Sequence, residues 1–136
     1  MRHKKVVYVE DNHDDQLLAS RIFSKMDYSP DVIMLDDGEE AITYLKRLVD
    51  VPDLVFVDLS LPKLNGVEVI REMKKLERYL TVPFVVMTDS NSQKHLLDAY
   101  KAGAFSFINK LQVMDWGREL KGATYYWLSI NQRKVS

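Results

Sequence analysis

Residues 53–66 read DLVFVDLSLPKLNG, and this stretch carries the first indication of the fold. An unbroken apolar run leads into Asp58, and Pro62 follows four residues later. A run that is apolar at every position is typical of a strand covered on both faces of a sheet, and proline followed by Gly66 marks a loop. The sequence therefore places a carboxylate at the end of a buried strand, beside a loop.

Four other short runs are rich in β-branched and aromatic residues, and stretches of helical periodicity separate them. The five predicted strands cover residues 5–10, 31–35, 54–58, 83–88 and 105–109. Apolar residues at helical spacing include Leu18, Ile22 and Met26, then Val69, Ile70, Met73 and Leu76, and finally Trp116, Leu120, Ala123 and Trp127. This alternation predicts an α/β fold, a parallel sheet with helices on both faces.

The residues that end the predicted strands are polar. They are Glu10 and Asp11, Asp58, Thr88 and Asp89, and Asn109 and Lys110. Each alone has an ordinary explanation, as a helix cap, a turn residue, a strand residue or a surface lysine. Right-handed crossovers, however, place the carboxyl ends of all parallel strands at one edge, where such sheets bind ligands. Their joint occurrence there favours a functional site.

Acidic groups gathered at one edge need a compensating charge. Two carboxylates ~4 Å apart repel by about 4 kcal/mol at an effective dielectric constant of ~20. One lysine is too little to balance three of them, so we expect a divalent cation, and oxygen ligands of this kind suit Mg²⁺. The chemistry predicts metal-assisted phosphoryl transfer, with Asp58 as a nucleophile that forms an acyl phosphate.

Motifs in this order resemble the receiver domain of two-component response regulators. They are YVEDN after the first strand, DDGEEAI before the second helix, LVFVDLSLPKLNGVEVI through the third strand, VVMTDS at the fourth and KAGAFSFINK at the fifth. The resemblance covers residues 4–128. It implies a flavodoxin-like fold with five parallel strands in the order 2-1-3-4-5.

The resemblance also implies roles for the acidic residues. Asp58 accepts a phosphoryl group from a histidine kinase or a phosphotransfer protein. Asp11 and Asp58 bind Mg²⁺ directly, Glu10 binds it through water, and Ser60 contributes its backbone carbonyl.

Lys110 and Thr88 are implied to contact the phosphoryl group, and Phe107 is implied to be the aromatic switch residue coupled to Thr88. Three positions depart from the family pattern. Phe107 replaces a frequent tyrosine. Leu111 replaces a proline whose peptide bond to the preceding lysine is often cis, so we expect a trans bond between Lys110 and Leu111. Asp89 replaces a small residue, and we expect it either to alter the lifetime of the acyl phosphate or to cap the next helix.

Bulk properties are those of an ordinary globular domain: 136 residues, 46% apolar and 29% charged, with a net charge of −1. We expect a receiver domain over residues 1–131 and a tail over 132–136. The lack of cysteine excludes disulfides and thiol catalysis. Without a signal peptide, a membrane span or a basic patch, we expect a cytoplasmic protein that binds neither membrane nor nucleic acid.

No output domain is expected after the last helix. We therefore predict docking to a downstream protein target and no catalysis beyond the protein's own phosphorylation and dephosphorylation. Tyr125, Tyr126 and Trp127 are consecutive and cannot all face the core. They predict an interface, such as a homodimer through the fourth helix, fifth strand and last helix, with tyrosines lying along the surface as the alternative. A weaker similarity links the chain to regulators partnered with phytochrome-type kinases.

Three alternative functions use the same architecture. A haloacid-dehalogenase-type phosphatase would have an aspartate two residues after its nucleophile, where this chain has Ser60. A flavin mononucleotide module would have a phosphate loop rich in serine, threonine and glycine, whereas residues 10–15 read EDNHDD. A degenerate receiver that accepts no phosphate would lack part of the acidic set, which is complete here.

Overall fold

The computed structural model describes residues 4–27, 29–89, 93–110 and 116–130. Five strands form its sheet: β1 (Lys5–Val9), β2 (Asp31–Leu35), β3 (Leu54–Asp58), β4 (Phe84–Thr88) and β5 (Ser106–Asn109). They are parallel and lie in the order β2-β1-β3-β4-β5. This order confirms the expected flavodoxin-like sheet, and the predicted strand bounds differ from the observed ones by no more than one residue.

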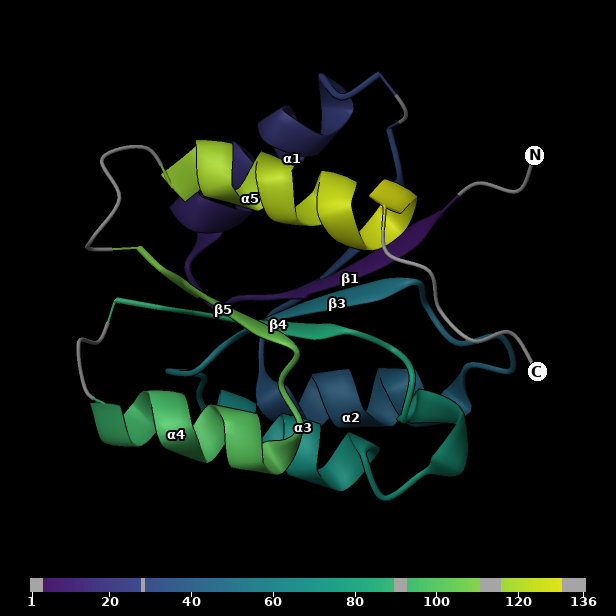
Figure 1. Ribbon diagram of the computed structural model, residues 1–136, viewed down its shortest axis with the longest axis vertical. Helices are drawn as coiled ribbons and strands as arrows, with labels where there is room; N and C mark the ends of the chain where they lie inside the picture. The colour runs from purple at the N-terminus through teal and green to yellow at the C-terminus, as the bar shows by residue number, and fades with distance from the viewer. Residues whose placement is uncertain (1–3, 28, 90–92, 111–115, 131–136) are drawn as a thin grey trace.

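Helices cover both faces of the sheet (Figure 1). On one face lie α1 (His13–Ser24) and α5 (Trp116–Tyr125), and on the other lie α2 (Gly38–Arg47), α3 (Gly66–Met73) and α4 (Gln93–Ala102). The 3₁₀ helix η1 (Glu77–Tyr79) precedes β4, and the π-helical turn η2 (Tyr126–Ile130) extends α5. In the described part of the chain, no helix is long and apolar enough to cross a membrane.

The two faces of the sheet bury separate apolar clusters. Every residue of β3 and β4 is buried, as expected for central strands covered on both sides. Because alternate residues point to opposite faces, Val55 and Val57 join the cluster under α2, α3 and α4, whereas Leu54 and Phe56 join the cluster under α1 and α5. This double cover holds β3 rigidly, and with it Asp58 at its end.

Among the helices that begin at the carboxyl edge of the sheet, α1, α2 and α3 each have a polar cap. The side chains of Asn12, Asp37 and Asn65 accept hydrogen bonds from the backbone N–H of the third helical residue, at 3.0, 2.7 and 3.0 Å. In α3 the side chain of Glu68 accepts a hydrogen bond from the backbone N–H of Asn65, which completes a capping box. Caps of this kind contribute about 1 kcal/mol each and hold the loops that surround the edge.

The buried face of α1 is rotated slightly from the sequence prediction. Leu18 is 41% exposed and Ala19 and Phe23 are buried instead, whereas Ile22 and Met26 pack, partly buried, against the same cluster as predicted. The reason is the aromatic packing under this helix: the ring of Phe23 lies 5.9 Å from that of Tyr8 and 6.1 Å from that of Phe56. The predicted face of α3 is confirmed, with three of its residues buried: Val69, Ile70 and Met73.

The end of the last helix leaves two tyrosines outside the core. Tyr125 is 56% and Tyr126 is 44% exposed. Trp127 instead packs on Phe105, with 5.6 Å between ring centroids, and its Nε1 donates to Ser106 Oγ at 3.2 Å. The expectation that the three consecutive aromatic residues do not all face the core is therefore confirmed.

The side chain of Lys74 contacts several segments near the amino ends of β4 and β5. Its Nζ donates to the carbonyl oxygens of Tyr79 at 2.8 Å and Val82 at 2.7 Å. The ammonium also lies 4.8 and 4.6 Å from the ring centroids of Phe84 and Phe105. Burial lowers the pKa of Lys74 to about 8. This side chain joins the end of α3 to the starts of β4 and β5.

Candidate functional site

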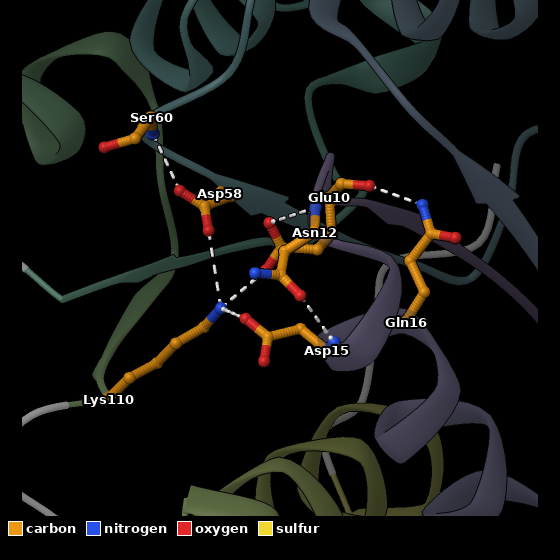
Figure 2. Close-up of polar contacts among 7 residues, drawn as sticks. All are labelled: Glu10, Asn12, Asp15, Gln16, Asp58, Ser60 and Lys110. Carbon is orange, nitrogen blue, oxygen red and sulfur yellow. Dashed lines mark hydrogen bonds and ion pairs between the residues drawn. The ribbon is translucent and has the colours of Figure 1, made fainter.

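The carboxyl ends of β1, β3 and β5 meet around one ammonium group (Figure 2). Lys110 Nζ lies 2.5 Å from Glu10 Oε1 and 3.4 Å from Asp58 Oδ2. A third carboxylate reaches it from α1, because Asp15 Oδ2 lies 2.9 Å away. The backbone N–H of Lys110 donates to the carbonyl of Thr88 at 2.7 Å. The structure thus brings together three of the predicted site residues, which are Glu10, Asp58 and Lys110.

Asp58 ends the central strand and is held by the loop that follows it. Its Oδ1 accepts a hydrogen bond from the backbone N–H of Ser60 at 2.7 Å, while Oδ2 faces Lys110. The loop returns so closely that a Cβ on Gly66 would lie 2.5 Å from the carbonyl oxygen of Asp58. Only glycine fits this approach, which explains the glycine at the start of α3.

Glu10 is the most deeply buried of the carboxylates around Lys110, with a side chain 2% exposed. The backbone N–H of Asn12 donates to its Oε2 at 3.4 Å. Its backbone carbonyl accepts a hydrogen bond from Gln16 Nε2 at 2.5 Å. The same Gln16 nitrogen donates to Asp36 Oδ1 at 2.7 Å, so this side chain joins α1 to the turn after β2.

Burial and charge act in opposite directions on the pKa values of the site. Burial raises the pKa of Glu10 above its ordinary value, the hydrogen bond from Lys110 opposes the rise, and the charge of Asp58 adds to it. For Lys110, burial alone would lower the pKa, but the hydrogen bonds to Glu10 and Asp15 raise it above its ordinary value. Lys110 therefore stays charged, and the acidic groups around it outnumber the one ammonium.

Thr88 and Phe107 lie on neighbouring strands and on the same face of the sheet. Thr88 is buried at the end of β4, where it pairs with Asn109. Phe107 pairs with Val86, two residues before Thr88, and its half-buried ring packs against the cluster under α2, α3 and α4. Because alternate residues share a face, Phe107 and Thr88 are diagonal neighbours on one face of the sheet.

The remaining predicted residues are either exposed to solvent or lie outside the residues that the structure describes. The side chains of Asp11 and Asp89 are exposed. Leu111 lies outside the described residues, as do residues 90–92, so neither the expected trans bond nor the capping role of Asp89 is tested. The side chain of Trp116 is likewise outside the description.

The donors that a metal would need are present in kind. Glu10, Asp11, Asp58 and the carbonyl of Ser60 offer only oxygen atoms, which suit a hard divalent cation. Within the described ranges, no three acidic or histidine side chains stand in a metal-binding arrangement. The ammonium of Lys110 lies between two of the donors, Glu10 and Asp58, instead. The donor chemistry therefore fits a divalent ion, while the geometry is that of a lysine-centred cluster.

Asp15 is the site residue that sequence reasoning missed. The spacing of Leu18, Ile22 and Met26 would have turned Asp14 toward the sheet, because residues four apart share a helix face. The observed buried face contains Ala19 and Phe23, and Asp15 lies on that face, four residues before Ala19. The signal was therefore present, but it depends on the rotation of α1.

The sequence matches that of a known protein family. The match is to the response regulator receiver domain and covers residues 6–115. The chain belongs to this family. It is therefore a receiver domain of two-component signalling, as the motifs around Asp58 and Lys110 indicated.

Three proteins that resemble this receiver domain match it along most of their length. The probable methanogenesis regulatory protein FilR2 of Methanothrix harundinacea is 35% identical over 133 residues, which cover 93% of this chain and 85% of that protein. The phosphorylated cyanobacterial phytochrome response regulator RcpA has a TM-score of 0.90 and 29% identity, covering 98% of this chain and all of that one (100%). The Mn²⁺-bound form of response regulator Rcp1 has a TM-score of 0.86 and 25% identity, covering 97% and 99%. The similarity to phytochrome-associated regulators is confirmed.

Proposed function

We propose that this receiver domain accepts a phosphoryl group on Asp58 from a histidine kinase or a phosphotransfer protein. The observation that carries the proposal is the setting of Asp58, whose Oδ1 is held by Ser60 at 2.7 Å and whose Oδ2 lies 3.4 Å from the Lys110 ammonium. In the transfer, the Asp58 carboxylate attacks phosphorus, the bond from phosphorus to the donor histidine nitrogen breaks, and an acyl phosphate forms.

The cation that we propose for this site is Mg²⁺. Asp11 and Asp58 would bind it directly, Glu10 through water, and Ser60 through its carbonyl. Once bound, the ion would stabilise the charge that develops on the phosphoryl oxygens. The excess of carboxylates around Lys110 supports a divalent cation, and the Mn²⁺-bound relative is consistent with one.

The proposed switch uses Lys110, Thr88 and Phe107. The ammonium and the threonine hydroxyl would each bond a phosphoryl oxygen, and the movement of Thr88 would open space for the ring of Phe107 beside it. A charge-assisted hydrogen bond contributes ~1.5–3 kcal/mol net, so each contact shifts an inactive-to-active equilibrium roughly ten- to one-hundred-fold. Such a shift suffices for signalling without a large rearrangement.

The proposed output is a protein surface along the β5 edge of the sheet, where α4 covers one face and α5 the other (Figure 1). Large exposed side chains lie on these elements or directly next to them in the sequence: Leu97, Tyr100, Phe105, Tyr125 and Tyr126. We infer that a downstream protein or a second copy of this chain docks there. Sedimentation with and without beryllofluoride, a phosphoryl mimic, tests the homodimer, and a monomer in both conditions would contradict it.

We propose no catalysis beyond the domain's own phosphorylation and dephosphorylation. Ser60 stands where a phosphatase of the haloacid dehalogenase type would need an acidic residue. Steady turnover of small phosphoesters by the purified protein would reverse this assignment.

The phospho-acceptor is tested by weighing the intact protein after incubation with a small phosphodonor and Mg²⁺. Wild type should gain the mass of one phosphoryl group, and Asp58→Asn should not. Asp50→Asn is the matched control, because Asp50 is exposed and lies before β3, at the other end of the strand. A chelator should prevent the gain. Equal labelling of Asp58→Asn and wild type would refute the assignment.

A further inference from the structure

The ammonium of Lys110 has a partner that the strand ends do not supply. Asp15 Oδ2 lies 2.9 Å from Nζ, closer than Asp58 Oδ2 at 3.4 Å. The backbone of Asp15 is fixed because its N–H donates to the cap residue Asn12 at 3.0 Å. Figure 2 shows the Asp15 side chain reaching Nζ from the helix, on a different side from Asp58. Lys110 is therefore held between α1 and β3.

We propose that Asp15 is a positioning residue that restrains Lys110 in the resting state and competes with the phosphoryl group for its ammonium. The inference rests on the proposed function of Asp58. A lysine has three N–H donors, and here three carboxylates, Glu10, Asp15 and Asp58, lie within reach of them. A phosphoryl group on Asp58 adds further acceptor oxygens beside Nζ, so one of the three N–H donors must exchange a carboxylate for a phosphoryl oxygen.

Burial decides which contact yields. The side chain of Glu10 is 2% exposed, so losing its ammonium partner would leave a carboxylate without solvent. The side chain of Asp15 is 32% exposed, and water can solvate it when Lys110 departs. Asp15 is therefore the partner that Lys110 exchanges for the phosphoryl group. Its charge also repels the incoming dianion while the exchange is incomplete.

The direction of the change in affinity for a phosphoryl mimic distinguishes competition by Asp15 from simple support of Lys110. If Asp15 only held Lys110 in place for catalysis, removing its carboxylate would weaken the binding of a phosphoryl mimic. If it competes for the ammonium, removal strengthens that binding. Asp14 provides the matched control, because it is the preceding residue of the same helical turn, carries the same charge and is exposed.

The test is a calorimetric titration of the full chain with beryllofluoride at saturating Mg²⁺. Asp15→Asn should bind about two- to five-fold more tightly than wild type, the range expected for a partly exposed ion pair. Asp15→Ala should show the same gain, and Asp14→Asn should match wild type. Thermal unfolding of each variant confirms that it is folded.

The outcomes separate the two levels of the proposal. Wild-type binding with no gain, or with a loss, in both Asp15 variants would overturn the role of Asp15 and leave Asp58 as the acceptor. An equal gain in Asp14→Asn would also overturn it, because general surface charge would then explain the effect. Wild type that binds no beryllofluoride would overturn both this role and the proposed function.

Discussion

Replacing Lys110 with methionine removes the only cation that the described structure places among Glu10, Asp15 and Asp58, while it keeps most of the volume of the stem. The three contacts are 2.5, 2.9 and 3.4 Å long, and the side chains of Lys110, Glu10 and Asp58 are 11%, 2% and 11% exposed. Losing one partner of a buried ion pair costs about 3–5 kcal/mol. Asp15 adds little because it is partly solvated. We therefore expect Lys110→Met to lower the unfolding free energy by about 3 kcal/mol.

Urea denaturation followed by circular dichroism measures this loss, provided that the slope of free energy against urea is unchanged. Adding Glu10→Gln to Lys110→Met should recover part of the loss, because the most deeply buried uncompensated carboxylate is then absent while that of Asp58 remains. The corresponding double-mutant cycle should report a strong coupling between these two residues. A loss below about 1 kcal/mol, or no recovery in the double variant, would refute the lysine-centred description of the site.

Three further predictions concern the surrounding fold. Burial holds the pKa of Lys74 at about 8, below its ordinary 10.5, so between these pH values the unfolded chain binds the extra proton and wild-type stability rises with pH. Lys74→Met should lack that rise in urea titrations, and a stability difference between the two proteins that is independent of pH would contradict it. The hydroxyl of Tyr8 is buried without a hydrogen-bond partner among the described atoms. Tyr8→Phe should therefore raise the unfolding free energy by about 1 kcal/mol. A lower unfolding free energy for this variant would contradict the prediction, because it would mean that the hydroxyl forms a hydrogen bond. Gly66→Ala should destabilise by about 1–3 kcal/mol and slow the phosphorylation of Asp58, because its Cβ would meet the Asp58 carbonyl at 2.5 Å. An unchanged labelling rate on phosphate-affinity gels would oppose this explanation.

Much of the fold was predictable because its signals are local. The runs that became β3 and β4 are apolar at every position before the polar residue that ends each strand, which is typical of strands covered on both faces. Gly103 ends α4 with a φ of 120°, a conformation that other residues rarely adopt. Asn12 caps α1 where the sequence indicated a helix start. None of these features depends on distant parts of the chain.

The site was predictable only as far as topology determines it. Parallel strands bring Glu10, Asp58 and Lys110 to one edge whatever the side chains do. How the ammonium is shared depends on packing, since the rotation of α1 that buries Phe23 also turns Asp15 inward. Periodicity along the helix indicated a face one residue away, so the pattern favoured Asp14 over Asp15 as the residue turned toward the sheet.

The central claim is that acidic groups distant in the chain gather around a divalent ion beside Asp58 as the phospho-acceptor. A crystal structure of the protein with Mg²⁺ and beryllofluoride tests it most directly. We predict beryllium bonded to an Asp58 oxygen, fluorides contacting Lys110 and Thr88, and Mg²⁺ held by Asp11, Asp58 and the carbonyl of Ser60. Beryllofluoride bound to another residue, or Asp11 still turned to solvent beside a bound ion, would contradict the account.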